Sequence, residues 1–173
     1  MKIILAERKK TQYVISITFD SDRVVRFAAK ELSSYLEKMS DAEFSVSENA
    51  KGRTIELVSG GNAKMDSFEI QVSDDGIKIH GANSRSVLYG VYDFLEKIGC
   101  NFVEPGKEIV PKSSRLIVDS MKCKSTAAFA LRNIFRIQIM PSKTEKYEGL
   151  EPSLHLPQID WMAKRKLNHY VFY

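Results

Sequence analysis

The sequence predicts an α+β fold: a two-layer sandwich in which a mostly antiparallel sheet carries two helices on one face. Three observations lead to this prediction. The β-prone runs are short and clustered, only two segments before residue 120 show a strong helical repeat, and one hairpin leads directly into the second helix. The helices are too few and the strands too clustered for a doubly wound parallel sheet.

The first part of the chain is expected to form two strands, a long helix and two further short strands. Residues 2–5 are apolar, and residues 13–17 alternate between apolar and polar side chains. Ser21 or Asp22 is expected to cap the first helix. Its apolar positions follow the 3.6-residue repeat: Val24, Val25, Ala28, Leu32, Tyr35, Leu36 and Met39. Strands at 44–46 and 54–58 come next, and the loop at 59–62 lacks the Lys-Ser/Thr of a phosphate-binding loop.

Residues 68–99 contain the clearest local signals in the sequence. Apolar residues alternate over 68–72 and again over 77–79, and Asp74-Asp75-Gly76 separates the two runs as a turn. Ser84 can cap the helix that follows, and Gly99 can end it in a left-handed conformation. The sequence therefore predicts a hairpin followed at once by a helix.

The segment after this helix is less regular. Residues 101–111 contain two prolines and a glycine and are expected to be irregular, and residues 115–118 offer a last β-prone run. Residues 122–128 are small and polar, as is typical of a linker. We therefore predict two units, a sandwich at 1–122 and a second unit at 123–173.

The second unit is predicted to be the start of another domain. An apolar run at 129–140 suggests a strand, residues 141–156 a long loop, residues 157–168 a helix opened by Pro157 and ended by Asn168, and residues 170–173 a second strand. A single βαβ unit cannot bury its own strands, and a complete (β/α)8 barrel needs about 250 residues. The expectation is a truncated βαβ start of such a barrel.

Composition indicates a soluble globular protein. A chain of 173 residues with 43% hydrophobic and 28% charged residues can bury a core without disulfides or metal. Its 26 basic and 22 acidic residues are mixed along the sequence and give a net charge of +4. Such a balance is typical of a solvated surface and does not favour nucleic-acid binding.

No metal, cofactor or membrane partner is predicted. Cys100 and Cys123 lack CxxC spacing and a nearby pair of histidines, so we expect reduced thiols, with a chance pairing as the alternative. His155 and His169 are too isolated to form a metal site. The three apolar residues at 3–5 are too few for a signal peptide or a membrane span, so the protein is expected to be cytoplasmic.

A set of short motifs is spaced along residues 28–111. They are AAKEL at 28–32 with Tyr35-Leu36, DSFEI at 66–70, IHG at 79–81, Arg85, LYGVY at 88–92 with Phe94-Leu95, Gly99, and then Pro105 and Val110-Pro111. Together they resemble the non-catalytic N-terminal domain of several glycoside hydrolases. The pattern is most similar to that domain in the family 67 α-glucuronidases and to the second domain of β-N-acetylhexosaminidases, and the resemblance extends over roughly residues 13–135.

The resemblance implies a sandwich packed against a (β/α)8 catalytic barrel whose two catalytic carboxylates lie on later strands. No catalytic residue is therefore assigned here, and whether the chain belongs to an active enzyme is left open. Arg132 is the one residue carried over, as a substrate-binding arginine, because in the hexosaminidases an arginine near the first barrel strand contacts sugar hydroxyls. Arg136 competes for this role, and an ion pair of Arg132 with an acid at a domain interface is the structural alternative. Asp160 is expected on the first turn of a helix, where it serves the helix dipole.

Two functional hypotheses follow. The first is a non-catalytic accessory domain that braces the catalytic barrel of the same polypeptide. The alternative is a free-standing carbohydrate-binding or protein-interaction module. Because the apolar runs at 129–139 and 170–173 would be strand edges without neighbours, either self-association through this tail or packing of the tail over the sandwich is also expected.

Overall fold

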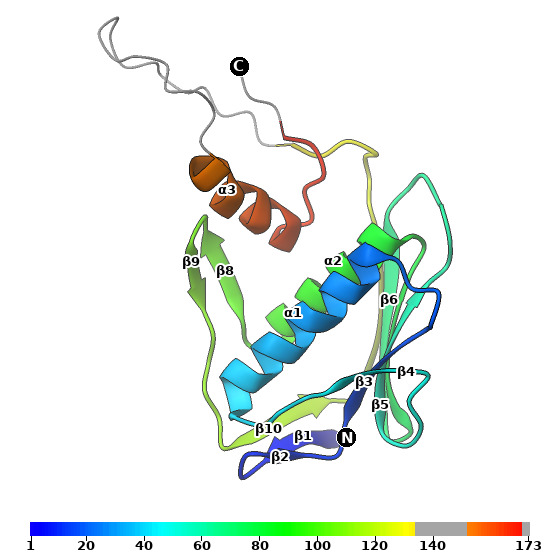
Figure 1. Cartoon of the computed structure of the whole chain (residues 1–173), viewed down its shortest axis with the longest axis vertical. Helices are drawn as coiled ribbons and strands as arrows, with labels where there is room; N and C mark the ends of the chain where they lie inside the picture. The colour runs from blue at the N-terminus through cyan, green and yellow to red at the C-terminus, as the bar shows by residue number, and fades with distance from the viewer. Residues whose placement is uncertain (134–151, 171–173) are drawn as a thin grey trace, which may run out of the picture.

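A computed structural model of the chain describes residues 1–133 and 152–170 (Figure 1). Over these ranges the elements are β1 (Lys2–Glu7), β2 (Lys10–Thr11), β3 (Val14–Ile17), α1 (Arg23–Ser40), β4 (Val46–Glu48), β5 (Thr54–Ser59), β6 (Ser67–Ser73), β7 (Gly76–Gly81), α2 (Ser84–Lys97), β8 (Asn101–Glu104), β9 (Lys107–Ile109), β10 (Arg115–Asp119), β11 (Met121–Thr126) and α3 (Pro152–Lys164).

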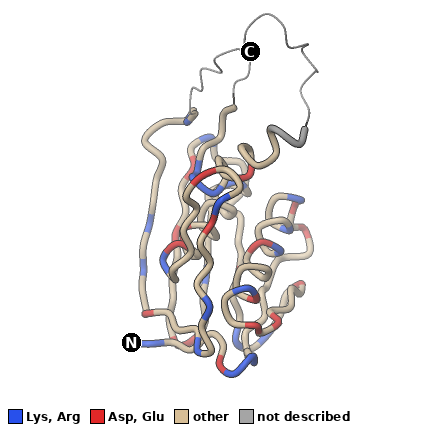
Figure 2. The backbone as a smooth tube through the Cα atoms, turned by 90° about the vertical axis from the view of Figure 1, so that its left-hand side faces the viewer, with Lys and Arg blue, Asp and Glu red and all other residues tan. Residues whose placement is uncertain are grey.

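The main sheet has the strand order β11-β6-β7-β5-β3-β4, and α1 and α2 lie together on one of its faces (Figures 1 and 2). The α+β sandwich is thus confirmed. In the described part of the chain five strand pairings are antiparallel and three are parallel. The parallel ones join β7, β5, β3 and β4, so the main sheet is mixed. The physical reason is that α1 connects β3 to its parallel neighbour β4, and a helical crossover returns the chain in the parallel direction. The chain then passes from β5 to β6 and returns as β7, which lies between them and is parallel to β5.

The two sandwich helices begin at side-chain caps. Asp22 accepts hydrogen bonds from the backbone N–H of Val24 and Val25, as one of the two predicted caps. The second helix is capped by Asn83 and not by Ser84, because the Asn83 side chain accepts from the Ser86 N–H at 2.7 Å. The two helix starts lie side by side, since the Ser84 hydroxyl donates to Asp22 at 2.5 Å.

The core lies between the helices and the inner face of the sheet. Ile79 of β7 is fully buried beneath α2 at Gly90, where an added Cβ would lie 2.6 Å from the Ile79 Cγ2 atom. The helix can approach the sheet this closely because position 90 carries no side chain. Leu32 and Tyr92 are also fully buried, and the Tyr92 hydroxyl of α2 donates to Glu31 of α1 at 2.8 Å.

Two segments differ from the sequence-based expectation. Residues 101–109, expected to be irregular, form the antiparallel hairpin β8–β9, which turns at Gly106 with φ of 74°. The predicted linker at 122–128 is wrong for residues 122–126, because β11 (Met121–Thr126) includes them and pairs with β6. β11 lies at the edge of the sheet and has a neighbouring strand on only one side. Polar residues are common in such an edge strand, so the composition of this segment does not distinguish it from a linker.

The second unit is described only in part. Residues 134–140 of the predicted strand, residues 141–151 of the predicted loop and residues 171–173 lie outside the described residues. Asn133 forms a parallel bridge with His169, on either side of α3 in the sequence. The helix begins at Pro152 and contains Pro157 in its interior, so the prediction that Pro157 opens it is wrong. Within the described ranges no helix is both long and apolar enough to cross a bilayer.

Candidate functional site

The candidate site is the contact between the sandwich and the C-terminal segment, defined here as residues 128–133 and 152–170. In Figure 1 α3 lies against the β8–β9 hairpin, and the chain after α3 crosses near α2. The contact has two parts: a hydrogen-bonded cluster around Asp66, and a charged cavity under α3.

Asp66 lies directly before β6, and its side chain is 4% exposed. From the sandwich, Arg85 donates to it from Nε at 3.1 Å and from Nη2 at 3.0 Å, and the Asn83 side-chain amide donates at 3.0 Å. From the C-terminal segment, Arg132 donates to the second carboxylate oxygen. One buried acid therefore joins the start of α2 to the C-terminal segment.

Arg132, the predicted substrate-binding residue, is held on several sides. Its Nε donates to the Lys166 carbonyl at 2.9 Å, its Nη1 donates to the Phe129 carbonyl at 2.7 Å, and its guanidinium lies 5.7 Å from the centre of the Tyr89 ring. Arg132 also forms an ion pair with Asp66. This is the geometry expected if Arg132 binds an acid at the interface and not a sugar. A sugar contact by Arg132 stays a prediction, and its competitor Arg136 lies outside the described residues.

Asn168 closes the Asp66 cluster. Its side-chain oxygen accepts from the Arg132 backbone N–H at 2.8 Å, and its amide donates to the Ala130 carbonyl at 2.7 Å. These bonds hold residues 130–132 beside the chain that follows α3, where Asn133 and His169 form their parallel bridge. The parallel geometry is the one that a βαβ unit requires.

The electrostatics of Asp66 follow from these partners. Burial alone would raise the pKa of Asp66, but hydrogen bonds from Arg132, Arg85 and Asn83 outweigh it and hold the pKa below its ordinary value. The carboxylate therefore stays ionised at neutral pH. An ionised acid paired with two arginines is suited to fixing structure and not to donating a proton.

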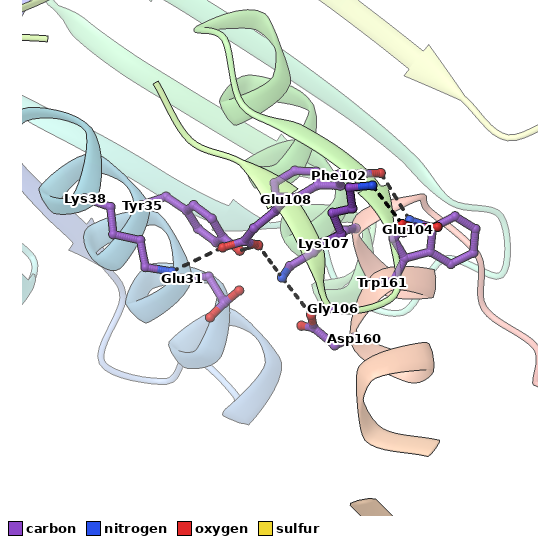
Figure 3. A pocket seen from close by; sticks show the side chains of 11 residues that line it. Glu31, Tyr35, Lys38, Phe102, Glu104, Gly106, Lys107, Glu108, Asp160 and Trp161 are labelled. Atoms are coloured by element: carbon purple, nitrogen blue, oxygen red, sulfur yellow. Dashed lines mark hydrogen bonds and ion pairs between the residues drawn. The ribbon is translucent and has the colours of Figure 1, made fainter. Parts of the chain in front are cut away.

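A cavity of about 340 Å³ lies between α1, the β8–β9 hairpin and α3 (Figure 3). Glu108 lies at its centre and accepts from the Tyr35 hydroxyl, from Lys164 at 3.1 Å and from Lys38 at 3.4 Å. Lys164 is 9% exposed and also pairs with Asp160 at 2.7 Å. The lining charges are thus largely matched with one another.

The cavity does not have the properties of a glycosidase acid–base pair. Burial raises the pKa of Glu108, but its hydrogen bonds from Tyr35 and Lys164 dominate and lower the pKa overall. A general acid for glycoside hydrolysis needs a raised pKa. Asp160 pairs with Lys164 at 2.7 Å, and the same lysine also pairs with Glu108.

Several sequence-based interpretations change at this site. Asp160 lies in the interior of α3 and pairs with Lys164, so its predicted place in the first turn of a helix is wrong, because the helix starts at Pro152. In the described ranges no group of three or more histidine, cysteine or acidic side chains could hold a metal ion. Glu108 and Asn168 were missed as site residues. The sequence does contain one signal for such acidic partners. Lys164, Arg165 and Lys166 are consecutive basic residues directly after an amphipathic stretch, and such a run suggests acidic partners elsewhere in the chain.

Comparisons with known proteins agree on the fold only. No protein-family model matches the chain, and no curated protein matches it. Among solved structures, it is similar to a family GH115 4-O-methyl-α-glucuronidase with specificity for decorated arabinogalactans, at 16% identity and a TM-score of 0.64 over 95% of this chain and 25% of that one. It is also similar to a chitobiase from Flavobacterium johnsoniae, at 13% identity and a TM-score of 0.51 over 78% of this chain and 21% of that one.

These structural neighbours are glycoside hydrolases, so the fold is one that glycoside hydrolases contain. The chain spans a quarter or less of the length of each of the two, 25% and 21%. The finer resemblance to family 67 is not confirmed by these comparisons.

Proposed function

We propose that this chain is a non-catalytic N-terminal accessory domain of a glycoside hydrolase, with the truncated start of a catalytic (β/α)8 barrel attached to it. The sandwich braces the barrel by holding its first strand and helix. The parent enzyme is proposed to be an α-glucuronidase, of the family 67 type that the sequence motifs resemble.

One observation carries the proposal. Asp66 of the sandwich binds Arg132, and through Arg132 and Asn168 it holds the parallel bridge between Asn133 and His169. Because separating a buried acid from its partner leaves an uncompensated charge, this contact favours a sandwich that stays bound to the first βαβ elements. The likeness to an α-glucuronidase over 95% of the chain supports the same arrangement.

The partners in this proposal are the catalytic barrel of the same polypeptide and, at most, a carbohydrate that Arg132 reaches. Self-association is a further proposal, supported by Phe129 and Leu131, which are 72% and 70% exposed. Light scattering on the purified chain tests it: a dimer or larger species supports self-association, and a monomer at all concentrations contradicts it.

Two measurements separate a brace from a carbohydrate-binding module. Isothermal titration calorimetry with glucuronoxylan oligosaccharides and hexosamine oligomers is expected to give no specific heat for a brace, whereas saturable binding would favour the module. An aryl-glucuronide assay is expected to show no turnover. Turnover that survives repurification and is absent from the Asp66→Asn and Glu108→Gln variants would place chemistry in this chain and contradict the proposal.

The coding sequence after Tyr173 gives an independent test. The proposal expects further strand–helix units, with two acids at the carboxyl ends of later strands. A downstream sequence without such units would contradict the barrel, and with it the brace.

A further inference from the structure

The ion pairs between the sandwich and the C-terminal segment all have the same polarity. In the part of the chain that the structure describes, five pairs cross this contact, and in each the acid belongs to the sandwich and the base to the segment. They are Arg132–Asp66, Lys164–Glu108, Arg165–Glu96, Lys166–Asp93 and Lys166–Glu96. Uniform polarity of this kind steers association and fixes the register of the two surfaces.

Most of these bases are consecutive in the sequence. Lys164 is the last residue of α3, and Arg165 and Lys166 follow it. Asp93 and Glu96, three residues apart on α2, share one face of that helix. Lys166 reaches both, at 2.8 and 3.1 Å, and Arg165 reaches Glu96 at 2.9 Å.

The backbone supports the same geometry. Lys166 has φ of 61°, a left-handed conformation that is uncommon for residues other than glycine. It turns the chain back over α2, where the Tyr89 hydroxyl donates to the Leu167 carbonyl at 3.0 Å. The turn thus places the basic residues on the acidic face of α2.

Apolar anchoring of α3 is small by comparison. Met162 is buried and Trp161 is half-buried, and the indole N–H of Trp161 donates to the Phe102 carbonyl at 3.1 Å. Leu156 and Ile159 of the same helix are 60% and 47% exposed. Ala163 and Trp161 pack against the core only in part, so charge pairing is left to contribute to the docking free energy.

We infer that Asp93, Glu96 and Glu108 form an acidic docking surface for the basic end of α3, and that high salt releases α3 while the sandwich stays folded. The ligand of this surface is the basic triplet Lys164-Arg165-Lys166 of the same chain. Salt screens exposed ion pairs more strongly than partly buried ones and weakens a buried apolar core hardly at all. The pairs of Arg165 and Lys166, whose side chains are 45% and 29% exposed, should therefore respond to salt before the pair of Lys164, which is 9% exposed. This docking surface extends the proposed function, because it identifies ion pairs as an interaction that holds α3 against the sandwich. It rests only on contacts within this chain and does not require a barrel or a carbohydrate.

The chain contains a single tryptophan, Trp161, and it lies in this contact. Its fluorescence therefore reports whether α3 is docked, without any added label. We expect the acrylamide quenching constant of Trp161 to rise about twofold or more between 0.1 and 1 M NaCl, as the Debye length falls from about 10 Å to about 3 Å. Far-UV circular dichroism should keep the signal of the folded sandwich over the same range.

Variants make the test specific. The double variant Asp93→Asn/Glu96→Gln is expected to show the high quenching constant already at 0.1 M NaCl. Glu69→Gln is the matched control, because Glu69 pairs with Lys122 between β6 and β11 and does not touch α3. Its quenching should equal that of the unaltered chain.

Three results would overturn the inference: quenching that is independent of salt, quenching that the double variant leaves unchanged, or loss of sandwich secondary structure at high salt. These readouts do not involve carbohydrate or turnover. Saturable carbohydrate binding or turnover would therefore count against the proposed function alone, and an unresponsive Trp161 against the docking surface alone.

Discussion

The sandwich and the C-terminal segment are stabilised by different interactions. The sandwich buries Leu32, Ile79 and Tyr92 completely, whereas the segment leaves Phe129 and Leu131 largely in solvent. Five ion pairs join the segment to the sandwich, and the core of the sandwich contains none of them. Burial of apolar surface is therefore sufficient to fold the sandwich, whereas charge is expected to contribute to the position of the segment.

The largest effect is expected inside the sandwich. Ile79→Ala removes a fully buried side chain beneath Gly90 and should lower the free energy of unfolding by about 2–5 kcal/mol. Urea denaturation followed by circular dichroism measures it. Ile109→Ala is the control, because Ile109 is 56% exposed and its truncation should have little effect. Equal losses in both variants would contradict the division between core and surface.

A smaller effect is expected where the two parts meet. Asp66→Asn removes the charge that Arg132 and Arg85 share, and should cost about 1.5–3 kcal/mol, the range for hydrogen bonds to a charged group. Amide exchange should quicken at residues 130–133 and 168–169 more than in β5 and β7. Asp75→Asn in the exposed hairpin turn is the matched control. Uniform quickening over the whole chain would show that Asp66 stabilises the sandwich and not the contact.

Lowering the pH is expected to weaken the contact between the sandwich and the C-terminal segment. The pKa of Asp66 is lowered in the folded chain, so its contribution to stability is complete above the unfolded pKa of about 3.9 and is lost as the pH falls through the folded value. Unfolding experiments from pH 7 to pH 2 should therefore show a loss from this group only below about pH 4. The Asp66→Asn variant should show a shallower decline there, and an identical decline would contradict a lowered pKa.

The smallest effect is expected from one neutral hydrogen bond. Trp161→Phe keeps an aromatic ring under α3 but removes the indole donor to the Phe102 carbonyl, at a cost of about 0.5–1.5 kcal/mol of docking free energy. Exchange of the α3 amides should quicken while β5 and β7 are unaffected. Ile159→Val, at a site 47% exposed, is the control. Slower or unchanged exchange in Trp161→Phe would show that the ring alone anchors the helix.

Much of the sandwich could be predicted because its signals are local. The repeat of α1, its cap at Asp22, and the turn that ends at Gly76 each depend on residues within a few positions of one another. The cap of α2 was assigned one residue too late, since Asn83 and Ser84 are both favourable cap residues and only the surrounding hydrogen bonds choose between them. The β8–β9 hairpin was missed because a Pro-Gly turn is equally typical of irregular chain.

The candidate site was predicted much less well. The sequence points to Arg132, but as a sugar-binding residue, and it shows the partner Asp66 only as part of a motif. The Asp66 cluster joins residues 66, 85, 132 and 168, and nothing in the spacing of these residues shows that they meet.

By itself, the sequence determined the α+β class, the hairpin leading into α2 and the apolar faces of both sandwich helices, because periodicity and capping are properties of neighbouring residues. The tertiary structure alone decided the parallel pairing of β5 with β3 and β7, the place of β11 at the sheet edge and the uniform polarity of the docking contact. Each of these depends on which distant surfaces meet when the chain closes its loops, and that choice is made by packing and by charge together.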